Sequence, residues 1–299
     1  MYIPDFIYHN PNTLEEALYL LGKPSSIAPL AGGTDLLVEI KKGITSFEEL
    51  VSLNSIKSLK QIEENDNNII IGACTSHNDI INSDIIKKYM PSLAETCKTI
   101  GSDQIRNTGT IGGNLCTCAS CADTAPILIA NNAKLEITSS VDSRTINLIE
   151  FLRGHHQNSL KKGELLINII VPKPKKHTAS YFTKFGLRNS AAISVASVAI
   201  SLQIQNDIIS EASVVVGACA STPIECPNSI QKLINANISN FKADGEKLKD
   251  FGNTVAQEIF PIDDIRGSRN YRKNVVKAIS QRALLEVINR IENPTGELK

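Results

Sequence analysis

The sequence of 299 residues predicts an α+β protein built of two domains. Strand and helix patterns alternate up to about residue 171, where a nearly continuous apolar run ends. The segment Pro172-Lys-Pro-Lys-Lys176 follows, and its composition is typical of a solvated linker. Beyond it, three strand patterns precede a run of helix patterns. We therefore expect a first domain over residues 1–175 and a second α+β domain over residues 178–292.

Composition and charge exclude several classes of partner. Lys plus Arg (31) equals Asp plus Glu (31), so no basic surface for nucleic acid is predicted. No apolar run is long enough to span a membrane, and the first residues lack the features of a secretory signal. Seven cysteines, an odd number, favour reduced thiols. We expect a cytoplasmic protein.

The beginning of the chain predicts a small β-α-β unit. Thr13 and Glu16 form a capping-box pattern for a first helix that ends at Gly22. The pattern continues with a strand at 27–30, a helix at 35–42 closed by a glycine, and a strand at 49–53. The turn Gly32-Gly33 thus follows the carboxyl end of a strand, where ligands of open α/β sheets bind.

The rest of the first domain predicts a mixed or antiparallel sheet with helices. Two strand patterns flank a turn at 65–68. Further on we expect helices at 75–81, 84–89, 91–99 and 124–130, and strands at 134–138 and 165–171. For the second domain we expect a three-stranded antiparallel sheet from strands at 181–186, 193–204 and 208–217, followed by helices at 228–234, 244–258 and 271–291.

Two glycine-rich segments share one pattern. The first is Leu30-Ala-Gly-Gly-Thr-Asp-Leu36, and the second is the stretch 101–115, which contains Thr110-Ile-Gly-Gly-Asn114. Paired glycines allow a positive φ and a close approach of the backbone to a ligand, so that several amides can point into one concavity. Such nests bind phosphate oxygens, and free amides at a helix start add to the effect. Two of them together predict a site for a pyrophosphate.

Three short segments carry a resemblance to a known family. They are Ala31-Gly-Gly-Thr-Asp-Leu-Leu37, Gln104-Ile-Arg-Asn107 and Thr110-Ile-Gly-Gly-Asn114, and the C-terminal Asp264-Ile-Arg-Gly-Ser-Arg-Asn-Tyr-Arg272 fits the same family's closing domain. With them the chain resembles, over nearly its whole length, the FAD-binding medium subunit of the molybdenum hydroxylases, the xanthine dehydrogenase family.

The resemblance implies an FAD site on both loops and at a few later positions. The implied contacts are Pro29, Leu30, Ala31, Gly32, Gly33, Thr34, Asp35, Leu36, Ile100, Gly101, Gly109, Thr110, Gly112, Gly113, Asn114, Cys116, Thr117, Ala122, Asp123, Leu166 and Lys184. No residue of this chain is expected to act as a catalytic acid or base, and no metal ligand is assigned.

Two of these residues have alternative interpretations. Asp123 could accept a hydrogen bond from a ribityl or ribose hydroxyl, or it could cap the helix that follows it. Lys184 could stabilise the negative charge of a reduced flavin, or it could be a solvated surface charge. The resemblance favours the functional role for Lys184.

Cysteines cluster directly after the second loop, in Cys116-Thr-Cys-Ala-Ser-Cys121. An iron-sulfur cluster would need a fourth ligand from Cys74, Cys97, Cys219 or Cys226. The loop is short for that purpose, so we expect structural or reactive thiols rather than a cluster. The five histidines show no metal-ligand spacing.

The resemblance also implies partners and a reaction. A large subunit would carry molybdopterin, and a small subunit would carry two [2Fe-2S] clusters that pass electrons to the FAD of this chain. NAD is one possible acceptor, although the segment 187–192 lacks the acidic residue of NAD-reducing relatives. A dimer of heterotrimers is expected. Two alternatives stay open: a self-sufficient flavin oxidase of the vanillyl-alcohol-oxidase type, and a non-redox nucleotide-binding scaffold subunit.

Overall fold

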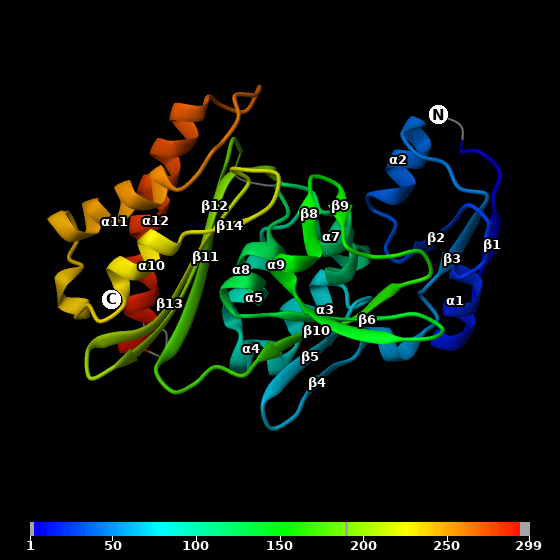
Figure 1. Cartoon of the computed structure of the whole chain (residues 1–299), viewed down its shortest axis with the longest axis horizontal. Helices are drawn as coiled ribbons and strands as arrows, with labels where there is room; N and C mark the ends of the chain where they lie inside the picture. Colours follow the sequence, from blue (N-terminus) through cyan, green and yellow to red (C-terminus); the bar gives the residue numbers. More distant parts are fainter. Residues whose placement is uncertain (1–2, 189–190, 294–299) are drawn as a thin grey trace.

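The structure, a computed structural model, describes residues 3–188 and 191–293. It is an α+β fold, as predicted, with three main sheets arranged along the long axis of the molecule (Figure 1). The N-terminal sheet, the central sheet and the C-terminal sheet follow one another in chain order. Helices lie between and beside them.

The predicted β-α-β unit forms the N-terminal end. Strand β3 (Glu49–Ser52) lies between β1 (Ile7–His9) and β2 (Ile27–Leu30), and both pairings are parallel. Helices α1 (Leu14–Leu21) and α2 (Leu36–Lys42) complete the unit. The capping box at α1 differs in one detail: Thr13 accepts from the Glu16 amide at 3.2 Å, but the Glu16 carboxylate accepts from the amide of Asn12.

The central sheet is antiparallel, in the order β4-β5-β10-β6-β7. Its strands are β4 (Ile62–Glu64), β5 (Asn68–Gly72), β10 (Leu165–Pro172), β6 (Lys134–Thr138) and β7 (Ser143–Asn147). The short helices around it are η1 (Lys57–Lys60), α3 (His77–Asn82), α4 (Asp84–Tyr89), α5 (Pro91–Lys98), α6 (Asp103–Thr108), α7 (Ile111–Thr117), α8 (Thr124–Ala130) and α9 (Leu148–Phe151), and a small hairpin is made by β8 (Leu152–Gly154) and β9 (Gln157–Asn158).

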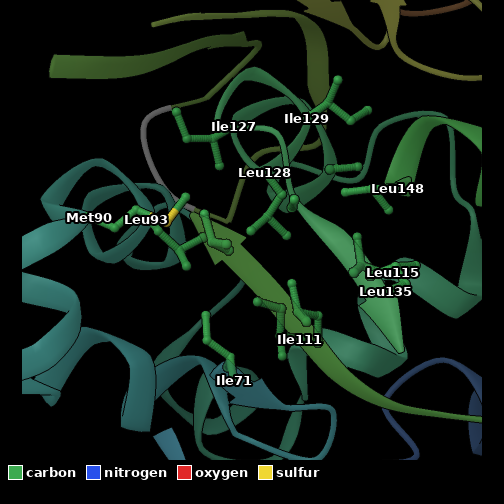
Figure 2. Close-up of a cluster of buried hydrophobic side chains, with 14 of the residues drawn as sticks. Ile71, Met90, Leu93, Ile111, Leu115, Ile127, Leu128, Ile129, Leu135 and Leu148 are labelled. Atoms are coloured by element: carbon green, nitrogen blue, oxygen red, sulfur yellow. The ribbon is translucent and has the colours of Figure 1, made fainter. Parts of the chain in front are cut away.

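The core of this part is apolar and fully buried. Side chains from β5, α5, α7 and α8 meet there (Figure 2). Ile111 and Leu115, which flank the second glycine pair, are 0% and 1% exposed. Burial of these two side chains fixes the orientation of α7, so its opposite side is left for a ligand.

The stretch 101–115 is therefore not a loop. It folds into α6 and most of α7, and neither Gly112 nor Gly113 has a positive φ. The expectation that the second glycine pair adopts left-handed backbone is wrong, because Thr110 caps a helix that begins at Ile111.

The C-terminal sheet is antiparallel and is built from β11 (Thr178–Gly186), β12 (Ser194–Gln205), β13 (Ile208–Gly217) and the two-residue β14 (Ile224–Glu225), which the sequence did not predict. Asn206 and Asp207 form the tight turn between β12 and β13, both with positive φ. Helices α10 (Pro227–Leu233), η2 (Ile238–Asn240), α11 (Glu246–Gln257) and α12 (Arg269–Glu292) follow.

The C-terminal sheet is covered on both faces. Helices α10–α12 pack on one side, and α5 and α8 of the first part pack on the other (Figure 1). Phe182, Ala199 and Val215 of the sheet join the core of the first part. The two parts thus share a core, because side chains of the C-terminal sheet complete the hydrophobic core of the first part.

The segment between β10 and β11, which the sequence predicts to be a solvated linker, is held in place by contacts with the rest of the protein. Lys173 pairs with Glu64 and lies over the Tyr89 ring, and Lys175 pairs with Glu211. Among the residues described, none of the helices is both long and apolar enough to cross a membrane.

Candidate functional site

A cavity of about 670 Å³ lies between the two glycine segments. It is lined by most of the residues that the sequence singled out, at positions 29, 31–36, 100, 109, 110, 112–114, 116, 117 and 166. Five predicted residues do not line it: Leu30, Gly101, Ala122, Asp123 and Lys184.

The first segment offers unpaired amides. Gly33 has a φ of 70°, a conformation that favours glycine, and the chain turns there into α2. Within residues 3–188 and 191–293, the amides of residues 32–36 donate to no other protein group. Because they lie on the wall of a cavity, these five donors are available to an anionic ligand.

The second segment is different. The amides of Ile111, Gly112 and Gly113 already donate to Thr75 O, Ala73 O and Thr110 Oγ1, at 3.0, 2.8 and 3.1 Å. The expectation that the Gly112-Gly113 pair presents free amides is thus wrong. Gly112 instead lets α7 pack closely on Ala73, whose O atom would lie 2.6 Å from an added Cβ, whereas a Cβ on Gly113 would meet only Thr110 Oγ1, at 2.9 Å.

Close contacts hold the two segments together. A Cβ on Gly32 would lie 2.0 Å from Thr108 O, so only glycine lets the first turn approach the end of α6. Thr117 Oγ1 donates to Gly113 O at 2.9 Å and lies 3.3 Å from Asp35 Oδ2. The first turn is therefore held against the end of α6 and against α7, and these elements bound the cavity.

Lys184 and Asp123, which do not line the cavity, form a buried ion pair. Lys184 Nζ donates to Asp123 Oδ2 at 2.6 Å and to Thr99 O at 2.9 Å, and Ser194 Oγ donates to Asp123 Oδ1 at 2.6 Å. The two side chains of the pair are 11% and 8% exposed. Burial raises the pKa of Asp123, while Lys184 and Ser194 act in the opposite direction.

This geometry corrects two interpretations. Lys184 is not a solvated surface charge, and Asp123 makes no capping bond to α8. The oxygens of Asp123 accept from β11 and β12 instead, so the pair links the two parts of the molecule. The neighbour of Thr99 is Ile100, which lines the cavity.

Replacing Lys184 by methionine should lower the free energy of unfolding by about 2–4 kcal/mol at neutral pH, because a buried carboxylate loses its cation. Without Lys184 the pKa of Asp123 rises further above its unfolded value. The loss should therefore be small at about pH 5 and larger at about pH 8, since stability falls as pH rises through a raised folded pKa. Urea unfolding at both pH values measures it.

The matched control is Lys175→Met, which removes the cation of a solvent-exposed pair and should cost at most about 1 kcal/mol. Equal losses for the two variants, or a loss independent of pH, would show that Lys184 does not balance a buried charge.

A further wall of the cavity was not predicted. It consists of His156, Asn158 and residues 160–165, together with Cys74 and His77 from the other side. Asn158 Nδ2 donates to Cys116 O, and His156 Nδ1 lies 2.9 Å from Thr117 O, so the β8–β9 hairpin is fixed to the end of α7. The one signal in the sequence is the turn Lys161-Lys-Gly-Glu164 directly before the strand that carries Leu166.

The three clustered cysteines have separate surroundings. Cys116 lines the cavity, Cys118 donates to Leu115 O, and Cys121 lies near Arg266. Burial raises the pKa of Cys116 to about 12 and that of Cys118 to about 11, so both are thiols at neutral pH. In the described part of the chain, no three His, Cys, Asp or Glu side chains are arranged to hold a metal ion.

We expect the purified chain to contain no iron, and the triple variant Cys116→Ser, Cys118→Ser, Cys121→Ser to keep its ligand. Metal and sulfide analysis of anaerobically purified protein measures this. About four iron and four sulfide per chain would contradict the expectation, since a Cys-ligated cubane has that composition.

The chemistry of the cavity suits a phosphate-bearing cofactor with ring systems. Residues with unpaired amides, the threonines Thr34 and Thr110, and several apolar residues line it. Such a site binds and orients a cofactor through the backbone rather than supplying an acid and a base.

Comparison with known proteins agrees with this chemistry. Residues 4–174 match the model of the FAD binding domain in molybdopterin dehydrogenase, and residues 180–287 match the CO dehydrogenase flavoprotein C-terminal domain. Glyceraldehyde dehydrogenase medium chain of Sulfolobus acidocaldarius is 31% identical over 287 residues, which cover 96% of this chain and 100% of the relative. Xanthine dehydrogenase FAD-binding subunit of Escherichia coli O157:H7 is 29% identical, with 94% and 95% covered.

Solved structures show the same fold. A chain of carbon monoxide dehydrogenase from Hydrogenophaga pseudoflava superposes with a TM-score of 0.91 at 28% identity, over 97% of this chain and 99% of that chain. The family models and the relatives identify the class as flavoprotein oxidoreductases. The chain belongs to the family of FAD-binding medium subunits of the molybdenum hydroxylases.

Replacing Gly113 by valine should lower FAD affinity by at least about 10-fold while the protein stays folded. Gly113 lines the cavity, and valine is no worse than glycine inside a helix. The added Cβ would lie 2.9 Å from Thr110 Oγ1, so the capping hydroxyl must shift by a few tenths of an ångström. FAD content after purification and the thermal midpoint of the FAD-free protein measure the two effects. A variant that keeps one FAD per chain would show that this side of α7 does not face the cofactor.

Proposed function

We propose that this chain holds FAD so that it accepts electrons from [2Fe-2S] clusters of a small partner subunit and passes them to an acceptor such as NAD. A large partner subunit would carry molybdopterin and oxidise the substrate, and two heterotrimers would form a dimer in the cytoplasm. The observation that carries the proposal is the cavity with five unpaired amides, in a chain of the FAD-subunit family.

Each part of the cavity has a defined role in this proposal. The amides of residues 32–36 would bind the pyrophosphate, and Thr110, Asn114 and Thr117 would contact it or the ribityl chain from the opposite side. Ile100 and Leu166 would pack against the flavin ring and exclude water. When bound, FAD supplies the redox chemistry, and the protein supplies its position and electrostatic surroundings.

The buried pair of Lys184 and Asp123 would act on the cofactor indirectly, through residues that line the cavity. Lys184 and Asp123 fix Thr99 and thereby Ile100. Their charges nearly cancel, so we expect their effect on the flavin potential to be smaller than that of an isolated lysine. Leu30, Gly101 and Ala122 would support residues that line the cavity.

The alternatives are less well supported. A self-sufficient oxidase of the vanillyl-alcohol-oxidase type needs a substrate domain, whereas residues 180–287 match a flavoprotein C-terminal domain of CO dehydrogenase. A non-redox nucleotide-binding scaffold subunit could also use the cavity, but the relatives of this chain are subunits of dehydrogenases. The acceptor stays open: Leu187, Arg188, Ala191 and Ala192 carry no acid, and residues 189 and 190 lie outside the described part of the chain.

Two measurements test the proposal. A tagged chain purified from its own organism should bring down two further polypeptides, together with molybdenum, iron and FAD. Anaerobic addition of NADH should then bleach the visible flavin absorbance if NAD is the acceptor. A chain that purifies alone and without FAD would contradict the proposed role, and bound FAD that NADH does not reduce would exclude NAD.

A further inference from the structure

His77 is a buried side chain at the junction of the two glycine segments. It is 3% exposed and lines the cavity. Its backbone amide donates to Gly109 O at 3.1 Å. A Cβ on Gly109 would lie 3.4 Å from His77 Cδ2 and 3.5 Å from Thr34 Oγ1, so the imidazole and the Thr34 hydroxyl approach the same point.

The imidazole is neutral. Burial, and to a smaller extent the charge of Arg106, lowers the pKa of His77 to about 4. At neutral pH one ring nitrogen therefore carries a hydrogen and the other accepts.

The neighbouring thiol selects the tautomer. Cys97 Sγ lies 3.7 Å from His77 Nδ1. Among the described residues, each of these two side chains has the other as its hydrogen-bond partner. Burial raises the pKa of Cys97, so it is a thiol with a hydrogen to donate. Because an imidazole nitrogen accepts better than sulfur does, Cys97 donates to Nδ1 and the ring hydrogen is on Nε2.

Nε2–H then has no acceptor within the described protein. It is bonded to Cδ2, the ring atom that would lie 3.4 Å from a Cβ on Gly109. Nε2 is not fully buried, and because His77 lines the cavity, a ligand oxygen there can accept from it.

We propose that His77 is an additional cofactor-binding residue, whose Nε2–H donates to an oxygen of the FAD pyrophosphate at the junction of the two glycine segments. This rests on the proposed FAD site. His77 adds a side-chain donor to the amides of residues 32–36, and Cys97 is the positioning residue that keeps the hydrogen on Nε2.

The test compares ligands that share the pyrophosphate with one that lacks it. Calorimetry on the full-length chain freed of FAD would measure FAD, ADP and riboflavin. His77→Leu should weaken FAD and ADP by the same factor, about 10- to 100-fold, as expected for a hydrogen bond to a charged group. Riboflavin binding should be unchanged. His77→Gln, whose side-chain amide can replace Nε2–H, should stay within about threefold of the wild type.

The control is His177→Asn, an exposed histidine on the segment between β10 and β11, which should bind all three ligands like the wild type. Unchanged FAD and ADP affinities in His77→Leu would overturn the proposal. A loss for FAD and riboflavin with ADP unchanged would also overturn it, because it would place the imidazole beside the flavin ring. If the wild type binds neither FAD nor ADP, the proposed function fails as well.

A second measurement does not depend on affinity. In protein labelled with 15N-histidine, the His77 signals, assigned with His77→Gln, should show a hydrogen on Nε2, and the Nε2 signal should shift on addition of ADP. In Cys97→Ala the preference for this tautomer should weaken. A hydrogen on Nδ1 in both the free and the ADP-bound protein would contradict the inference.

Discussion

Arg272→Leu should lower the free energy of unfolding by about 3–5 kcal/mol, the largest stability loss expected from a single change in this chain. Arg272 is 2% exposed. Its Nη1 donates to Val195 O and Ala218 O at 2.8 and 2.9 Å, and its Nη2 donates to Asp264 Oδ1 at 2.6 Å. Leucine leaves the carbonyls of Val195 and Ala218 without this donor, while Asp264 keeps its hydrogen bonds to Arg266. The motif 264–272 therefore has a structural role, because Arg272 connects α12 to β12 and to the end of β13.

Urea unfolding of the full chain measures the effect. Arg282→Leu is the matched control, since Arg282 is exposed on the same helix and should change stability by at most about 0.5 kcal/mol. If Arg272→Leu cost less than about 1 kcal/mol, the buried network would not hold the C-terminal sheet to its helix.

Gly32→Ala should reduce FAD affinity by about 100-fold or more. The added methyl group would lie 2.0 Å from Thr108 O and 3.1 Å from Gly109 Cα, and both are backbone atoms that cannot rotate away. The first turn must therefore move from the end of α6, and the cavity loses its shape. FAD titration of the purified variant, monitored by flavin fluorescence, measures the loss.

Gly22→Ala is the control, because its methyl group would make only contacts of 3.4 Å and longer. It should bind FAD like the wild type. Wild-type affinity in Gly32→Ala would mean that FAD binding does not need the close approach of the first turn to the end of α6.

The sequence predicted the order of the elements well because most of them carry local signals. Apolar runs, caps and closing glycines fixed the β-α-β unit, and Asn206-Asp207 marked a hairpin turn. β14 has only two residues and no such signal. A glycine pair, by contrast, is compatible with both a nest and a helix, so the conformation of Gly112 and Gly113 depended on the cap at Thr110.

Most of the predicted site residues that line the cavity are close together in sequence, in the two glycine segments. The contacts missed or misread join distant positions. Asp123 and Lys184 are paired across the two parts, and His77, which lines the cavity, donates its backbone amide to Gly109 O. Burial and pairing of such groups are decided by tertiary packing, which a single sequence does not display. The same holds for the wall formed by residues 156–166.

The central claim is that FAD lies in this cavity with its pyrophosphate on the amides of residues 32–36. A crystal structure of the full-length chain with FAD bound tests it most directly. We predict pyrophosphate oxygens within hydrogen-bond distance of those amides, with the flavin ring between Ile100 and Leu166. A pyrophosphate bound elsewhere, with the amides of residues 32–36 left without an acceptor, would contradict the account.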